Sequence, residues 1–140
     1  MDRLMIYTSY FANVKRISEA RPGMVFVSIA GGSPDWIAGA GVKFVKYGKL
    51  APRWTWWSEW KEKFGKNPES AESMEWYKKK YSETILSKLD PAAVAAELES
   101  MADGSELCLL CWEAPGKFCH RRLVADWLGS AGITCLEFKK

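Results

Sequence analysis

Residues 4–29 read LMIYTSYFANVKRISEARPGMVFVSI and contain two apolar, β-prone segments separated by a helical pattern. The first segment, 4–7, predicts a strand, and apolar residues then recur at helical spacing from Phe11 to Ile17. Pro22-Gly23 predicts a turn, and the β-branched run 24–29 predicts a second strand. A strand, a helix and a strand within so short a stretch form a βαβ unit. Such a unit favours a parallel sheet with a right-handed crossover.

The rest of the chain continues this alternation. Asn67 and Asp90 are typical N-cap residues, and a proline follows each of them. The further elements that we expect are a short strand at 42–45, a tryptophan-rich helix ending near Gly65, helices after Asn67-Pro68 and Asp90-Pro91, a strand at 107–112, a helix at about 120–130 and a last strand at 133–138. We therefore predict an α/β fold: a single three-layer domain over 1–140, with a mainly parallel sheet of roughly four to five strands and helices on both faces.

The composition predicts one soluble domain. The chain has 140 residues, of which 48% are hydrophobic, so it is long enough for one core and short for two. No stretch reaches the roughly 18 apolar residues of a membrane span, and the N-terminus lacks a signal-peptide core. The net charge of +3 is too small to indicate a protein that mainly grips phosphate backbones. We expect a cytoplasmic protein without a membrane partner, and the sequence does not predict its oligomeric state.

The reactive residue types gather at 107–122, which read LCLLCWEAPGKFCHRR. This stretch holds the only histidine, His120, and three of the four cysteines. It runs from the end of an expected strand to the start of an expected helix, which is where ligands bind in parallel α/β sheets. Side chains alternate along a strand. We therefore expect Cys108 in the core and Cys111, near the strand's carboxyl end, beside the ligand crevice.

Cys119 stands at the expected helix start, where unpaired N–H groups and the helix dipole stabilise a thiolate. Such a thiol serves as a nucleophile, a redox centre or a metal ligand. Glu113 is a candidate acid or base, and Arg121 is suited to hold an anion with a bidentate fork. The four cysteines crowd into the last third of the chain, and a domain of this size needs no disulfides. We therefore expect reduced thiols.

Three cysteines and a histidine are also the residue types of a zinc site. However, Cys108 and Cys111 are expected to face opposite sides of their strand. The adjacent side chains of Cys119 and His120 diverge unless the backbone bends sharply. We therefore predict no metal site, and we expect no cofactor.

The spacing of these residues resembles the C-x-E-x-x-P-x-x-C-H-R signature of the DUF488 family, which has no assigned function. Cys111, Glu113 and Cys119-His120-Arg121 match it in identity and spacing, whereas Pro115 lies one position earlier than the proline of the signature. The resemblance implies an α/β fold and a shared pocket of cysteine, glutamate, histidine and arginine. It implies no known reaction.

One departure from the family pattern concerns an arginine. Members tend to carry it after the second strand, where this chain has Ser28-Ile29-Ala30 followed by Gly-Gly-Ser-Pro. If that arginine helps to hold an anion, its role passes here to another group such as Arg53. Weaker likenesses occur in the opening strand at 6–10, at Leu50-Ala51-Pro52 and at Tyr81.

Our leading hypothesis is a small enzyme-like α/β domain that binds an anionic, nucleotide-like ligand where the first, second and fourth strands end. The predicted catalytic residues, which supply a nucleophile and acid–base groups, are Cys119, Glu113, His120 and Cys111. The predicted ligand-binding residues, which supply hydroxyl, amide and guanidinium groups, are Arg121, Thr8, Ser9, Tyr10, Ser33 and Arg53. The expected reaction is hydrolysis or group transfer, and the sequence leaves open whether the protein is an enzyme.

Two other functions stay open. Four of the eight tryptophans fall at 54–60. With Arg53 and Lys61 they would stack on bases of single-stranded nucleic acid, or dock a partner protein, although aromatic residues at helical spacing are more often core. A redox or thiol-sensing protein would use Cys111 and Cys119, provided that their Cα atoms lie within about 7 Å.

Overall fold

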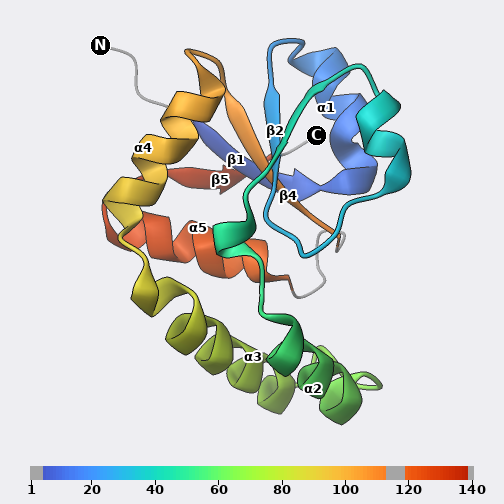
Figure 1. Cartoon of the computed structure of the whole chain (residues 1–140), viewed down its shortest axis with the longest axis vertical. Helices are drawn as coiled ribbons and strands as arrows, with labels where there is room; N and C mark the ends of the chain where they lie inside the picture. Colours follow the sequence, from blue (N-terminus) through green and yellow to red (C-terminus); the bar gives the residue numbers. More distant parts are fainter. Residues whose placement is uncertain (1–4, 113–118, 139–140) are drawn as a thin grey trace.

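Parallel strand pairing organises the molecule, as the βαβ pattern predicts. The computed structural model describes residues 5–112 and 119–138. Its five strands are β1 (Ile6–Tyr10), β2 (Val25–Ser28), β3 (Lys43–Lys46), β4 (Leu107–Cys111) and β5 (Cys135–Glu137), in the order β3-β2-β4-β1-β5 (Figure 1). Every neighbouring pair is parallel. The carboxyl ends of all the strands therefore lie along one edge of the sheet.

Helices cover both faces of the sheet, which confirms the predicted three-layer α/β fold. Helix α1 (Val14–Ala20) lies on one face, and α4 (Pro91–Ala102) and α5 (His120–Ser130) lie on the other (Figure 1). Between β3 and β4 the chain also forms α2 (Trp54–Phe64) and α3 (Ala71–Thr84). These two helices lie side by side and extend beyond the sheet (Figure 1). Short 3-10 turns connect the elements at Phe11–Asn13, Asp35–Gly39, Gly48–Leu50 and Leu86–Lys88.

The alternation of β4 divides the apolar interior into two cores. Leu107 and Leu109 belong to the larger core, between the sheet and helices α2 to α5. Cys108 and Leu110 belong to the smaller core beneath α1, together with Phe26. Cys108 is completely buried there, which confirms that it is a core residue. Cys111, two residues after Leu109, lies on the same face of β4 as Leu107 and Leu109.

Of the two helix starts predicted from an N-cap residue followed by proline, one is confirmed and one is wrong. The Asp90 carboxylate accepts a hydrogen bond from the Ala93 N–H, and Pro91 is the first residue of α4. Helix α3, by contrast, begins at Ala71 rather than directly after Asn67-Pro68. Asn67 lies in a turn that follows α2, and the Ser70 hydroxyl caps α3 by accepting from the Ser73 N–H. Two cap signals lie three residues apart, and the second one starts the helix.

Most strands lie close to the predicted limits, but β1 ends at Tyr10, three residues beyond the predicted end at residue 7. β3 begins one residue later than predicted, and β5 is shorter because only Cys135 to Glu137 pair with β1. Among residues 5–112 and 119–138, none of the helices combines the length and hydropathy that crossing a bilayer requires. The carboxyl ends of β2 and β4, the start of α5 and the helix pair α2–α3 meet at one place. The candidate site lies there.

Candidate functional site

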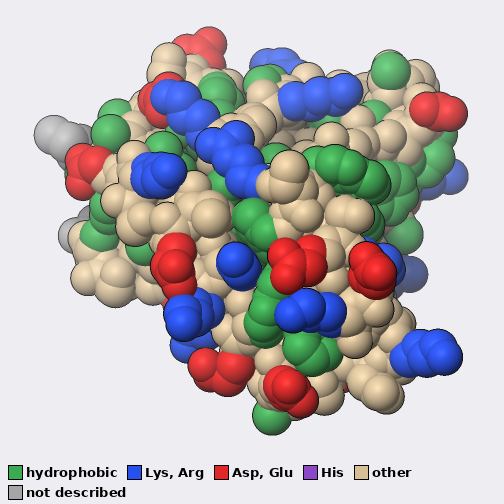
Figure 2. Space-filling model, turned by 60° about the horizontal axis from the view of Figure 1, so that its bottom comes forward, with side chains coloured by type: hydrophobic (Ala, Val, Ile, Leu, Met, Phe, Trp, Pro, Cys, Tyr) green, Lys and Arg blue, Asp and Glu red, His purple; other side chains and the backbone are tan. Residues whose placement is uncertain are grey.

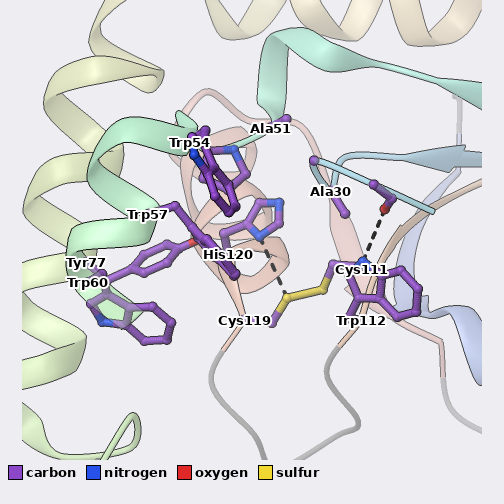
Figure 3. Close-up of a pocket in the computed structure, with 13 residues that line it drawn as sticks. Ala30, Ala51, Trp54, Trp57, Trp60, Tyr77, Cys111, Trp112, Cys119 and His120 are labelled. Atoms are coloured by element: carbon purple, nitrogen blue, oxygen red, sulfur yellow. Dashed lines mark hydrogen bonds between the residues drawn. A yellow bond between two sulfur atoms is a disulfide. The ribbon is translucent and has the colours of Figure 1, made fainter. Parts of the chain in front are cut away.

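A cavity of about 570 Å³ opens at the carboxyl edge of the sheet. The described residues that line it come from the loop after β2, the segment before and within α2, helix α3, the end of β4 and the start of α5. They are Ala30, Gly31, Gly32, Ala51, Pro52, Trp54, Trp57, Trp60, Tyr77, Cys111, Trp112, Cys119 and His120. Figure 3 shows the aromatic side chains of α2 and α3 on one side, facing the two cysteines and His120. None of these lining residues carries a formal charge when His120 is neutral.

The junction between β4 and α5 brings the two cysteines together. Cys111 is the last residue of β4, and its side chain lies on the same face as that of Leu109. Cys119 is the N-cap of α5 and has an extended backbone, with φ −151° and ψ 147°. Their sulfurs form a disulfide, and the Cα atoms lie 7.2 Å apart. The expectation of reduced thiols holds for Cys108 and Cys135, whereas it is wrong for this pair, because the strand end and helix start converge.

His120 is held as a neutral imidazole beside this disulfide. Its Nε2 lies 2.6 Å from the carbonyl oxygen of Ile29, an acceptor, so Nε2 carries the proton and donates it. Its Nδ1 is therefore unprotonated and faces the Cys119 Sγ at 3.8 Å (Figure 3). Burial lowers the pKa of His120 to about 4. At neutral pH the side chain offers a lone pair at Nδ1 to whatever lies next to the sulfurs.

Arg121 lies behind the cavity rather than in its lining. Its side chain is almost completely buried and forms a two-point ion pair with Glu137, with N···O distances of 3.1 and 3.0 Å. Its Nη1 also donates to the Cys111 Sγ at 3.0 Å. The Thr8 hydroxyl donates to the same Glu137 carboxylate at 2.6 Å, and the guanidinium lies over the Tyr10 ring. Arg121 therefore supports Cys111 instead of facing the cavity.

Glu137 is a residue that the sequence reasoning missed. It pairs with Thr8 in the register of β1 and β5, and this pairing brings its carboxylate beneath α5. An acidic residue in the last apolar segment was the available signal. Only the strand order, however, shows that the Glu137 carboxylate forms its ion pair with Arg121.

The other predicted site residues lie apart from the cysteine pair. Ser9 is buried and accepts a hydrogen bond from Asn13. Ser33 and Arg53 are not among the lining residues, although each directly follows one, Gly32 and Pro52 respectively. Glu113 lies outside the described residues. Of the ten predicted residues, the structure thus brings Cys111, Cys119 and His120 together in the lining, with Arg121, Thr8 and Tyr10 behind them.

The tryptophans at 54–60 divide between core and cavity. Trp56 and Trp60 are nearly buried, and their indole N–H groups donate to Thr84 and Ser73. Trp54 is 71% exposed and stacks on Trp57 at a centroid distance of 5.3 Å. A base-stacking platform of four exposed tryptophan rings is therefore excluded. Trp54 and Trp57 are the more accessible tryptophans of α2 in the cavity lining.

The donor atoms beside the cavity also suit a metal. Cys111 Sγ, Cys119 Sγ and His120 Nδ1 lie within 4.8 Å of one another. The expected divergence of Cys119 and His120 is wrong, because the extended N-cap followed by the first helical residue supplies the sharp bend. Cys108 lies in the core on the opposite face of β4, as the alternation along the strand predicts.

Comparison with known proteins identifies the family. A family model described as "Active DUF488-N3 subclade" matches residues 33–132, more than half of the chain. The match includes helices α2 to α5, β4 and the Cys-x-Glu and Cys-His-Arg parts of the motif. No curated protein and no solved structure matches the chain significantly. The chain belongs to the DUF488 family, in its DUF488-N3a group.

Proposed function

We propose that this protein binds a nucleotide-like ligand in the cavity and hydrolyses it, or transfers a group from it, at the cluster of Cys111, Cys119 and His120. The observation that carries the proposal is the cavity itself. It joins a wall of aromatic rings to a cluster of two sulfurs and an unprotonated imidazole nitrogen. A flat base would occupy the aromatic side, and the reacting bond would lie near the cluster.

The aromatic wall supports the base-binding part. Trp57 lines the cavity and stacks with Trp54 at an interplanar angle of 27°, and Trp60 and Tyr77 continue the wall. Stacking on an aromatic side chain contributes roughly 1–3 kcal/mol for each base and tolerates any base. The described part of the lining carries no formal charge, which suits a base better than it suits a phosphate.

The anionic part of the ligand would lie at the rim. Arg53 is exposed and stands between two lining residues, Pro52 and Trp54. Within the described residues, the N–H groups of Gly31 and Gly32 donate no hydrogen bond, so both are available to phosphate oxygens. Backbone N–H groups in such a loop are typical anion donors. Arg121 has no part in this proposal, since Glu137 holds it.

The reaction requires the two thiols in reduced form. A free Cys119 at the start of α5 would be acidified by the helix dipole, and its S–H would donate a hydrogen bond to the Nδ1 of His120. The same cluster with its disulfide intact lacks a nucleophile. Turnover is therefore expected only after reduction.

Calorimetric titration of the reduced protein tests the proposal. We expect binding of nucleosides and nucleoside monophosphates, and weaker binding of ribose 5-phosphate, which has no base. Trp57→Leu should weaken binding by about 5- to 150-fold, the equivalent of one lost stacking partner. Trp36→Leu is the matched control, because Trp36 is half-exposed and lies outside the lining.

Two results would count against the proposal. One is that no base-containing compound binds, and the other is that Trp36→Leu weakens binding as much as Trp57→Leu does. Mass spectrometry of reduced protein incubated with each bound nucleotide detects a product or an adduct. Loss of that product in Cys119→Ser, with binding retained, would assign the reaction to the cluster.

Single-stranded nucleic acid is the second candidate ligand, because the highly exposed Trp54 stands at the cavity rim. The face shown in Figure 2, where the bottom of the Figure 1 view comes forward, has acidic and basic side chains interspersed. A groove that tracks a phosphate backbone is instead mainly positive. We therefore favour the small ligand. Much tighter binding of an oligonucleotide than of a mononucleotide would reverse this preference.

A further inference from the structure

We infer that Cys111, Cys119 and His120, once the disulfide is reduced, form a Zn²⁺ site whose fourth coordination position opens into the cavity. The inference goes beyond the proposed function, since zinc binding needs no nucleotide and is measured without one. It rests on five features of the described residues: the donor set, the spacing of the two cysteines, the groups behind the donors, the number of donors and the open side.

The donor set is of the kind that zinc prefers. Two thiolates and one imidazole nitrogen are soft to borderline ligands. In a tetrahedral site such atoms lie roughly 3.5–3.8 Å apart, because Zn–S is about 2.3 Å and Zn–N about 2.0–2.1 Å. The Cys119 Sγ and His120 Nδ1 already lie 3.8 Å apart. Two thiolate charges would also neutralise the ion, which permits a buried site.

The positions of the two cysteines leave room for an ion. Their Cα atoms lie 7.2 Å apart, beyond the range of about 4.4–6.8 Å that disulfides usually span. After reduction the sulfurs can separate around an ion with the backbone in place. Cys111 is held by the β4 ladder and Cys119 by its place at the start of α5.

Groups behind the donors orient them. The Nε2–H of His120 donates to the Ile29 carbonyl at 2.6 Å, which turns Nδ1 toward the sulfurs. The Arg121 Nη1 donates to the Cys111 Sγ at 3.0 Å and would stabilise a thiolate. Hydrogen bonds of this kind to metal ligands fix the tautomer and ring orientation.

The number of donors that the described residues supply is that of a reactive zinc site rather than a structural one. Structural zinc sites have four protein ligands, whereas catalytic sites have three and keep one position open. Cys108, the nearest further cysteine in sequence, lies in the core beneath α1. Among the described residues, only Cys111, Cys119 and His120 come together as such a group. All three line the cavity, so it supplies both the entry path and the open position.

Reduction must precede metal binding. A tertiary phosphine breaks the Cys111–Cys119 bond by giving two electrons to the sulfurs. The phosphine becomes its oxide with the oxygen of one water molecule, and the two protons of that water end on the sulfurs. Zinc then displaces both thiol protons to solvent. In the zinc-bound form Cys119 would be a ligand rather than a free nucleophile, and a water in the open position, acidified by the ion, would take that role toward the ligand in the cavity.

The test uses the whole chain reduced with a phosphine under anaerobic conditions. Cobalt(II) reports the site, since tetrahedral thiolate ligation produces intense sulfur-to-metal charge-transfer absorption. We expect one ion for each chain, displaced by zinc, and loss of the band in Cys111→Ser and in Cys119→Ser. Cys108→Ala is the matched control in the same strand, and it should retain the band. Plasma mass spectrometry of the dialysed protein gives the zinc content.

A measurement on the unmodified sequence avoids the risk that a serine variant loses the metal because it misfolds. Alkylation of the native reduced protein should modify Cys111 and Cys119, and zinc should protect both, as peptide mapping will show. Alkylation that zinc leaves unchanged overturns the inference, as does a band that survives in both serine variants or disappears in Cys108→Ala. Failure of nucleotides to bind would contradict the proposed function alone and leave the zinc result standing.

Discussion

The two faces of the sheet are covered by very different amounts of chain. On one face, the seven-residue helix α1 and short turns close a small apolar core. On the other face, α4 and α5 cover the sheet, and α2 and α3 extend past its carboxyl edge. The candidate cavity forms where the covering layer extends beyond the strands that it would otherwise cover. The first face therefore contributes stability, while the second contributes stability and the candidate site.

The strongest test of this division removes a large side chain from the α1 face. Phe26 is completely buried beneath α1. Phe26→Ala should lower the free energy of unfolding by about 3–5 kcal/mol, because the lost ring leaves a cavity in a packed core. Chemical denaturation measures this loss. Cobalt binding by the folded fraction should stay unchanged, and a weaker metal affinity would show that the two faces are not independent.

Tyr81 tests the opposite face. It is completely buried, and its hydroxyl donates to the carbonyl oxygen of Leu50 at 2.6 Å. Tyr81→Phe leaves that carbonyl without its partner and should cost about 1–3 kcal/mol. Since Leu50 directly precedes the cavity residue Ala51, this loss should also loosen the cavity. Faster hydrogen exchange in the segment before α2 is the expected result, and unchanged exchange would contradict it.

The same residue predicts a pH dependence. Burial, with a smaller contribution from Tyr77, raises the pKa of Tyr81 well above its ordinary value. The folded state therefore keeps a proton that the unfolded state loses above about pH 10. Stability should be complete below that pH and should fall as pH rises further. Tyr81→Phe should show a shallower alkaline loss, and Tyr47, whose pKa burial also raises, accounts for part of the remainder.

Helix α2 allows the comparison to be made within one element. Trp56 is nearly buried and donates to Thr84, whereas Trp57 is only partly buried and lines the cavity. Trp56→Phe should destabilise the fold by about 1–2 kcal/mol through the lost hydrogen bond and ring contacts. Trp57→Phe should change stability by less than about 0.5 kcal/mol. Thermal unfolding measures both losses. A larger loss of stability in Trp57→Phe than in Trp56→Phe would contradict the division between core and cavity.

Local patterns were sufficient for most of the fold. Alternation of apolar strands with helical stretches predicted the three layers, and the Asp90-Pro91 cap predicted the start of α4. Local patterns were insufficient where two N-cap residues of equal strength stand close together, as at Asn67 and Ser70. Both residue types are good N-caps. Asn67 belongs to the turn that follows α2, so Ser70 caps α3.

The site was less accessible to sequence reasoning because its decisive contacts cross between elements. The reactive types at the β4–α5 junction were found, and three of them share the cavity. Arg121 pairs with Glu137 because β5 lies next to β1 in the sheet. Sequence patterns do not predict that strand order. Likewise, the helical spacing places Trp56, Trp57 and Trp60 on one side of α2, but it does not show how deeply each one is buried. The contacts with Tyr77 of α3 bury Trp56 and Trp60.

The smallest expected effect concerns a helix that supports the second face without lining the cavity. The Asp90 carboxylate caps α4 by accepting from the Ala93 N–H at 3.2 Å. Asp90→Ala should lower the free energy of unfolding by about 1 kcal/mol, and Asp90→Asn, which preserves the acceptor, should have almost no effect. Neither change should alter cobalt binding, since α4 contributes no lining residue. If the alanine variant weakened the metal site, α4 would belong to the cavity-forming part of the second face, and the site would depend on that whole layer.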